Sequence, residues 1–207
     1  MAKATSKTTP VKKTTAATKA PAKAASPARA VRTAKPGIKV EPVDAITLLK
    51  ADHREVDALF SEFEHATRSD QKARIVARIC DELKIHTLIE EEIFYPAVRA
   101  KIDPSIVDEG IVEHDGAKVL INDLAGAKAS DDYYDAKVKV LAEEIRHHVH
   151  EEEKWLRGMF AQARRADLDM MKLGTKLAVR KAELKTLANG KGLPAARPVA
   201  VKLVPVD

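Results

Sequence analysis

Aromatic side chains are scarce in this chain, and so is cysteine. Phe, Trp and Tyr make up 4% of the 207 residues, and Cys80 is the single cysteine. One cysteine excludes an internal disulfide framework and favours a reducing compartment such as the cytoplasm. The apolar residues, 45% of the chain, are mainly Ala, Val, Leu and Ile, and strand-like runs bounded by tight turns are missing. This composition predicts an all-α protein with a soluble core.

Long apolar runs are also missing. No segment approaches the roughly 18–20 consecutive apolar residues that a membrane-spanning helix needs. The N-terminal sequence lacks the apolar stretch of a secretory signal. We therefore expect no membrane partner.

Acidic residues are missing from residues 1–40, which carry ten Lys or Arg. The whole chain has 36 basic and 31 acidic groups, so the remaining 167 residues hold 26 basic and 31 acidic groups. The basic segment consists of Lys, Ala, Thr and Pro and cannot bury enough apolar surface to offset chain entropy. We expect residues 1–41 to form a disordered tail. Its charge would allow nonspecific, salt-dependent contact with nucleic acid.

Apolar residues recur at steps of three and four in five segments, which predicts five helices. The first spans about residues 45–66 and follows Asp44, a favourable N-cap. The second spans about residues 70–99, with Pro96 near its end, where it should bend or terminate the helix.

The third helix begins at Asp103-Pro104, an N-cap followed by a first-turn proline. The fourth follows Ser130 as its cap and runs to about residue 164. The fifth spans about residues 167–188 and ends at the C-cap signal Asn189-Gly190.

Short connections make neighbouring helices antiparallel. Residues 42–165 are therefore expected to form an up-down-up-down four-helix bundle. A C-terminal helix over residues 166–190 and an extended tail over residues 191–207 should follow it.

One histidine interrupts the apolar stripe of each bundle helix. These residues are His53, His86, His114 and His148. At about 1.5 Å of rise per residue, their distances from the connecting turns differ by about one helical turn or less. The four imidazoles should therefore converge on one layer of the core. Left without partners there, each would cost about 1–3 kcal/mol, so a common partner is expected.

Two of these histidines have a carboxylate one turn further on. The pairs are His86 with Glu90 and His148 with Glu152, and an i, i+4 pair lies on one helix face. Imidazole suits iron, zinc, copper or nickel, and carboxylates can bridge two ions. Four imidazoles and two carboxylates on facing helices therefore predict a di-metal centre.

His147 with Glu151 is a rival pair, because this part of the chain reads HHVHEEE. Residues three, seven and ten before His148 are all apolar, as they are before His86. Those before His147 include a glutamate and a lysine. The apolar phase therefore selects His148 with Glu152.

Other polar residues near these motifs are expected to serve the surface or the packing. The adjacent acids should form a solvated face; they are Glu91, Glu92, Glu151 and Glu153. Tyr95 is expected to pack in the core rather than to act at the site. No catalytic residue can be named.

Four ordered segments resemble the hemerythrin-like HHE cation-binding family. They are LLKADHREVDALF, HTLIEEEIFYPAV, IVEHDGAKVLI and HHVHEEEKWL, and they cover about residues 44–160. The resemblance implies a four-helix bundle with two non-heme iron ions (Fe2+/Fe3+). The iron ligands that it implies are His53, His86, Glu90, His114, His148 and Glu152.

The sequence departs from the respiratory proteins of that family at two ligand positions. Lys118 stands where they have a second histidine on the third helix, and Glu152 follows its histidine by four residues instead of an aspartate following by five. Ligand identity tunes a metal centre. The expected function is binding or sensing of oxygen, nitric oxide or peroxide, or iron handling in stress. A peroxide-decomposing enzyme and a nucleoid-associated protein using the basic tail are the alternatives.

Overall fold

The computed structural model describes residue 1 and residues 38–202 of the chain. The predicted disordered tail therefore lies almost entirely outside the described residues. Within the described part, all regular structure is helical, which confirms the predicted fold class. No described helix has the length and the apolar character needed to span a membrane.

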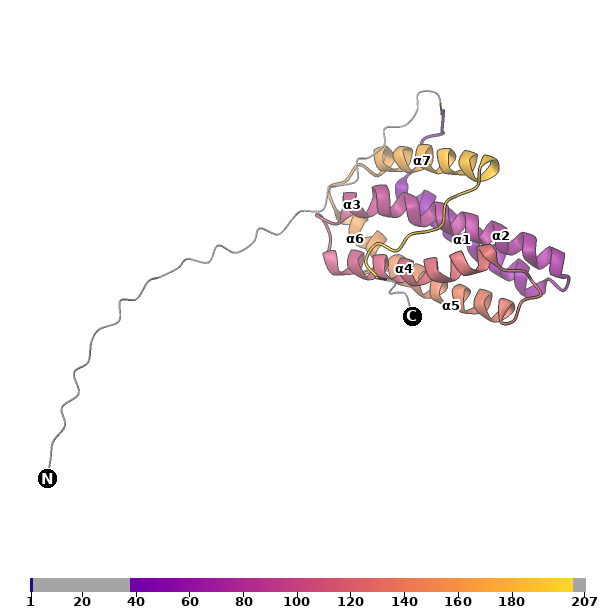
Figure 1. Cartoon of the computed structure of the whole chain (residues 1–207). Helices are drawn as coiled ribbons and strands as arrows, with labels where there is room; N and C mark the ends of the chain where they lie inside the picture. Colours follow the sequence, from indigo (N-terminus) through magenta and orange to yellow (C-terminus); the bar gives the residue numbers. More distant parts are fainter. Residues whose placement is uncertain (2–37, 203–207) are drawn as a thin grey trace. The chain divides into compact units, whose positions relative to one another are not determined.

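Four long helices form the bundle and are joined by turns in an up-down-up-down order (Figure 1). They are α1 (Ala45–His65), α2 (Ser69–Ile89), α4 (Pro104–Gly126) and α5 (Tyr134–Glu153). The predicted fifth helix, α7 (Met170–Gly190), packs against α1 and α2.

Two of the predicted helix starts are confirmed by their capping bonds. The Asp44 side chain accepts a hydrogen bond from the Thr47 backbone N–H at 3.0 Å. The Asp103 side chain accepts one from the Ser105 backbone N–H at 3.0 Å, with Pro104 in the first turn. Both carboxylates satisfy N–H groups that a helix start leaves unpaired.

The predicted Ser130 cap is wrong, and α5 begins later, at Tyr134. The Asp131 carboxylate instead accepts the Lys128 N–H at 2.8 Å, which holds these residues in a turn. Tyr133 then takes a left-handed conformation with φ of 63° before the helix starts.

The predicted end of the fifth helix is also displaced. The helix continues through Asn189-Gly190, and the left-handed residue is Gly192, with φ of 77°.

The fourth predicted helix is in fact two helices. It ends at Glu153, and a separate short helix, α6 (Met159–Arg165), follows. Gly158 makes this break possible, because a Cβ there would lie 2.6 Å from the Glu152 carbonyl oxygen. Trp155 is 85% exposed in the turn between the two helices, whereas Met159 in α6 is buried.

The second predicted helix is continuous to Val98 but changes its winding. A π-helical turn, η1 (Glu90–Phe94), connects α2 to α3 (Tyr95–Val98), and Pro96 lies in that last segment. The Tyr95 N–H bonds to the Glu90 carbonyl, five residues earlier. Such π turns are rare in proteins, and those that do occur are frequently at functional sites.

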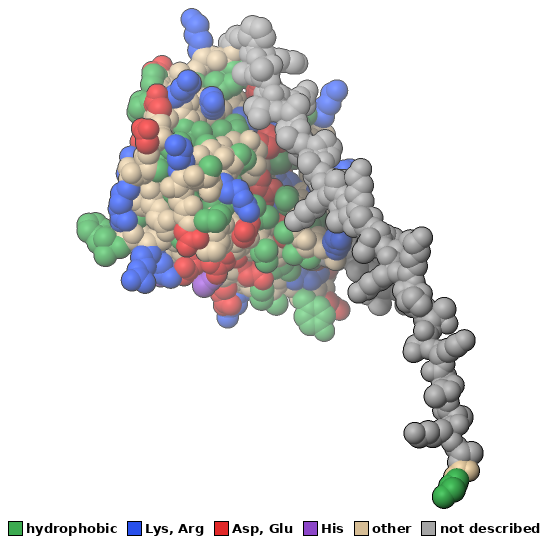
Figure 2. Space-filling model, turned by 90° about the vertical axis from the view of Figure 1, so that its left-hand side faces the viewer, with side chains coloured by type: hydrophobic (Ala, Val, Ile, Leu, Met, Phe, Trp, Pro, Cys, Tyr) green, Lys and Arg blue, Asp and Glu red, His purple; other side chains and the backbone are tan. Residues whose placement is uncertain are grey.

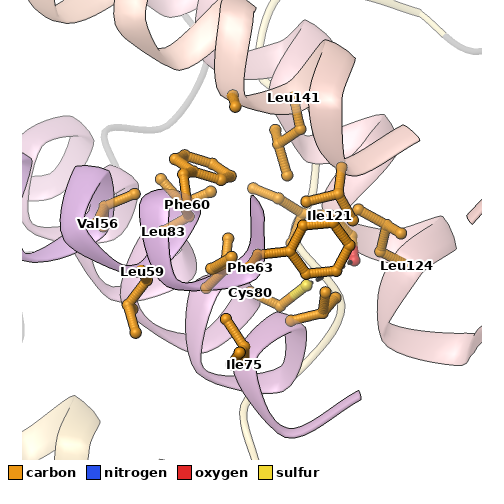
Figure 3. Close-up of a cluster of buried hydrophobic side chains, with 14 of the residues drawn as sticks. Val56, Leu59, Phe60, Phe63, Ile75, Cys80, Leu83, Ile121, Leu124 and Leu141 are labelled. Atoms are coloured by element: carbon orange, nitrogen blue, oxygen red, sulfur yellow. Dashed lines mark hydrogen bonds between the residues drawn. The ribbon is translucent and has the colours of Figure 1, made fainter. Parts of the chain in front are cut away.

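Two apolar clusters fill the interior, with a polar layer between them. The first gathers side chains such as Phe60, Leu83 and Leu141 (Figure 3). The second contains Leu49 and Phe160 among others. Along α1 the order is second cluster, buried His53, first cluster. The histidine layer therefore lies inside the core, with apolar packing on both sides.

Helix α7 lies so close to the start of α1 that only glycine fits at position 174. A Cβ on Gly174 would lie 1.9 Å from the Val43 carbonyl oxygen and 2.7 Å from the Ala45 nitrogen. We expect Gly174→Ala to lower the free energy of unfolding by about 1–3 kcal/mol, as overpacking does. Urea denaturation measures this change.

Gly116→Ala in α4 is the matched control, because nothing lies within 4 Å of a Cβ at that position. Alanine there should raise stability by about 0.5–1 kcal/mol through its higher helix propensity. Equal midpoints for Gly174→Ala and the unmodified protein would contradict the close contact between α7 and α1.

Candidate metal centre

The four predicted histidines meet in the polar layer as two pairs. The Nε2 atoms of His53 on α1 and His86 on α2 are 3.1 Å apart. Those of His114 on α4 and His148 on α5 are 3.2 Å apart. All four side chains are buried. Each pair of ring nitrogens therefore faces a common point, as two ligands of one ion do.

The two predicted carboxylates connect the histidine pairs. Glu90 Oε2 lies 3.1 Å from His86 Nε2 and 3.3 Å from His114 Nε2. Glu152 Oε2 lies 3.4 Å from His53 Nε2 and 3.7 Å from His148 Nε2. Each carboxylate thus touches one histidine of each pair, which is the arrangement of a bridging ligand.

The rival pair from the sequence does not enter this cluster. The His147 side chain is 64% exposed, and Glu151 pairs with Lys154 at the surface. The six residues predicted as ligands therefore all lie in one cluster in the polar layer.

Two buried oxygen atoms indicate that the cluster suits cations. Within the described part of the chain, Glu90 Oε1 and Glu152 Oε2 have no hydrogen-bond partner. A buried carboxylate oxygen without a partner is costly, and a metal ion removes that cost. Nitrogen and carboxylate donors in this ratio fit a pair of transition-metal ions.

Tyr95 is part of the cluster, and the prediction that it only packs is wrong. Its hydroxyl lies 3.1 Å from Glu152 Oε1, 3.2 Å from His114 Nε2 and 3.4 Å from Glu90 Oε2. Burial and the nearby carboxylates raise the pKa of Tyr95 well above its usual value, so the phenol keeps its proton. The π turn places Tyr95 and Glu90, five residues apart, on the same side.

Each histidine directs its second ring nitrogen, Nδ1, toward a carboxylate on the preceding helix of the bundle. The Nδ1–oxygen distances are 2.8 Å for His53–Glu153, 3.7 Å for His86–Asp52, 3.0 Å for His114–Glu91 and 2.7 Å for His148–Glu113. The order is α1 to α2, η1 to α4, α4 to α5 and α5 back to α1, and we call these four pairs the carboxylate–histidine ring. Three of the contacts are hydrogen bonds, whereas His86 Nδ1 and Asp52 Oδ2 are too far apart for one and have no hydrogen-bond partner among the described residues. A carboxylate at Nδ1 fixes the tautomer and directs Nε2 toward a metal.

These outer carboxylates were missed, and the prediction of a solvated face is wrong for Glu91 and Glu153 among them. It is also wrong for Glu92, which is half-buried and pairs with Arg180 at 2.8 Å. The side chain of Glu91 is 13% exposed and that of Glu153 is 27% exposed. The sequence did contain an indication of their role, because each outer acid directly precedes or follows an inner group in the chain. The neighbours are Asp52-His53, Glu90-Glu91, Glu113-His114 and Glu152-Glu153. One residue off the inner stripe, a side chain points toward the adjacent helix.

Each of the four outer carboxylates also pairs with a cation or another titratable group. The pairs are Lys50 with Glu153 at 2.9 Å, Lys181 with Asp52, Lys118 with Glu91 at 2.6 Å, and His147 with Glu113 at 3.5 Å. Alternating signs of charge reduce the cost of burying the layer.

The carboxylates attract protons to the histidines. Burial disfavours the imidazolium of His86, but Glu90 and Asp52 outweigh it and raise its pKa to about 10. Burial likewise opposes charge on His114, and Glu90 with Glu91 raises its pKa to about 9. Protons thus compete with metal for the same nitrogens, and metal binding should release them.

Two cavities touch the centre. One of about 10 Å³ is lined by the four histidines together with apolar side chains, among them Val56 and Leu83. The other, of about 260 Å³, lies between α4 and the end of α5, and Glu113 and Glu152 contribute to its wall. The smaller cavity is on the side of the first apolar cluster, to which both of its named apolar residues belong.

The carboxylate–histidine ring predicts a loss of metal affinity when one acid is neutralised. Glu113→Gln keeps the side-chain size but removes the charge that stabilises the Nδ1–H of His148. We expect metal affinity to fall about 10–100-fold, the usual effect of outer-shell partners. Titration against a competing chelator measures it.

Glu109→Gln is the matched control for this prediction. Glu109 lies one turn earlier on α4 and lines the same large cavity, and it has no contact with the four ring nitrogens. The carboxylate–histidine ring has no part in metal binding if both variants keep the affinity of the unmodified protein.

Comparisons with known proteins agree with this geometry. The family model described as Hemerythrin HHE cation binding domain matches residues 44–160. A crystal structure of a hemerythrin HHE cation binding domain-containing protein from Mycobacterium kansasii has a TM-score of 0.61 and 22% sequence identity. The match covers 73% of this chain and 95% of that one, and at this identity it shows the fold alone.

A curated relative matches as well. A protein named DNA nickase from Nostoc sp. is 27% identical over 109 residues, which are 53% of this chain. The match spans only 31% of the length of that relative.

Proposed function

Because this chain belongs to the hemerythrin HHE cation-binding domain family, we propose that its centre holds two non-heme iron ions. We further propose that the protein binds or senses oxygen, nitric oxide or peroxide, or handles iron in stress. Cation binding follows from the family, whereas the metal, its count and its ligand are the proposal. Bound iron would supply a redox-active Lewis acid to which a small molecule can attach.

We assign one ion to His53 and His86 and the other to His114 and His148. These pairs are the close Nε2 contacts, at 3.1 and 3.2 Å. Glu90 and Glu152 would bridge the ions, and the two partnerless oxygens support this role. The Tyr95 hydroxyl donates a hydrogen bond to Glu152 Oε1 and would so hold that carboxylate in place.

The small cavity between the four histidines supports the proposal that the ligand is a small molecule. It touches all four histidines and has a volume of about 10 Å³, close to the minimum that one water molecule needs. Its other walls are largely apolar, with Val56, Leu83, Ile145 and Val149. A group of about the size of one water molecule fits such a space, so a ligand bound there must be small, and a larger organic substrate is excluded.

Metal analysis with absorption spectroscopy tests the proposal. We expect about two irons per chain, as in bundle di-iron proteins, and a ligand-to-metal charge-transfer band that changes when azide is added. His86→Ala should reduce the iron content and the azide response. His65→Ala is the matched control, because His65 is exposed on α1 and its ring contacts the Ser61 carbonyl, outside the histidine layer.

Other results of the same experiment would redirect or overturn the proposal. One zinc per chain, or no metal, would overturn it. Sustained turnover of peroxide by the iron-loaded protein, lost in His86→Ala, would establish the enzymatic alternative.

Nucleic-acid contact is a second candidate, and it rests on residues 1–40. These carry ten Lys or Arg without an acid. On the face shown in Figure 2, by contrast, Lys and Arg are scattered and acidic side chains gather together. The relative named DNA nickase adds to this candidate, although its activity belongs to a longer protein.

Retention on double-stranded DNA tests the second candidate. We expect binding at low salt that weakens steeply as salt rises, because neutralised phosphates release counterions. A variant with glutamine in place of every Lys and Arg in residues 1–40 keeps the length and should lose retention. Unchanged retention of that variant would rule out the tail as the binding segment.

A further inference from the structure

The segment that follows α7 crosses the bundle and lies along α4 (Figure 1). It is attached at two places. The Asn122 side chain donates to the Ala196 carbonyl at 2.7 Å and accepts the Ala196 N–H at 2.8 Å. Further on, the Asp115 carboxylate accepts three consecutive backbone N–H groups. They belong to Val199, Ala200 and Val201, at 2.7–2.9 Å. We call residues 196–201 the C-terminal strap.

Asp115 is an unusual residue to hold a surface segment, because it is buried and is the chain neighbour of His114. Three amide donors and an ammonium are the kind of partners that a buried carboxylate requires. The ammonium is that of Lys118, whose Nζ lies 3.0 Å from Asp115 Oδ1. Without the strap, most of these donors would be lost.

Lys118 connects Asp115 to the metal centre. Its Nζ also lies 2.6 Å from Glu91 Oε1, and the same oxygen lies 3.0 Å from Nδ1 of His114. The Lys118 side chain is only 3% exposed, so solvent does not screen these contacts. A continuous path of hydrogen bonds and ion pairs therefore runs from the strap through Asp115, Lys118 and Glu91 to His114.

We propose that the C-terminal strap is a positioning segment of the metal centre, so that strap docking and metal binding at His114 stabilise each other. This inference rests on the proposed function, because it requires an ion at the histidine pair. The docked strap fixes Asp115, Asp115 fixes the Lys118 ammonium, and the ammonium fixes the Glu91 oxygen that orients His114. Coupling of this kind is reciprocal, since each site changes the affinity of the other by the same factor.

A proline at position 199 weakens the contact without changing a side chain of the site, because it removes one of the three N–H donors to Asp115. Val199→Pro deletes an N–H that donates to both Asp115 oxygens, and Pro198 already restricts the backbone before it. Val199→Ala is the matched control, because it keeps the N–H and the Val199 side chain is 62% exposed. Thermal unfolding followed by circular dichroism checks that both variants fold.

The test combines iron affinity with hydrogen exchange. We expect Val199→Pro to bind Fe2+ about tenfold more weakly than Val199→Ala, within the range for outer-shell partners. In the unmodified chain, Fe2+ loading should slow the exchange of the Val199, Ala200 and Val201 amides. The amides of the exposed residues Ser69 and Asp70 at the start of α2, far along that helix from His86, should serve as an internal reference and keep their rates.

The outcomes separate this inference from the proposed function. Equal Fe2+ affinity of the two variants, with strap exchange unchanged by Fe2+, would overturn the inference while leaving the di-iron proposal intact. An unmodified chain that takes up no iron would overturn both.

Discussion

The structure depends on the contact between each core histidine and a carboxylate of the preceding helix. Every bundle helix supplies an inner group to the centre and, one residue away, an outer acid to the next helix. The inner group and the outer acid of a helix are neighbours in the chain. Rotating any helix by one residue would therefore break the contacts of both side chains at once. The carboxylate–histidine ring therefore fixes the rotation of all four helices and allows a polar layer to persist between two apolar clusters.

The same ring gives a role to Lys118, where the resemblance leads one to expect a histidine ligand. A charged lysine cannot bind a cation, and its ammonium lies instead between Glu91 and Asp115. The hydroxyl of Tyr95 lies among Glu90, His114 and Glu152 on the carboxylate side. The centre thus gathers four imidazoles, with a phenol and an outer cation beside them. Such a change alters the electrostatics of a metal pair without altering the bundle.

The sequence was sufficient to predict the bundle and to select six residues that do meet, because helical periodicity determines which side chains share a face. Periodicity does not determine which neighbour a side chain contacts, so the roles of Glu91 and Glu153 were missed. The break after Glu153 depends on the close approach of Gly158 to the backbone of α5, which is a tertiary contact. The strap contact joins Asp115 to residues 84 to 86 positions later, and such pairing leaves no local pattern.

Two elements that follow the family match, which ends at residue 160, reach different halves of the centre. Helix α7 provides Lys181, which pairs with Asp52 and through it faces His86. The strap acts through Asp115 on the other half, at His114. Each element approaches one histidine of one pair through an outer acid, and neither contributes an inner group. Outer acids set the basicity of a ligand histidine, so under the proposed function we expect each element to affect a different histidine pair. The difference in surroundings between the two pairs therefore lies in the outer parts of the chain, while the placement of the pairs comes from the bundle.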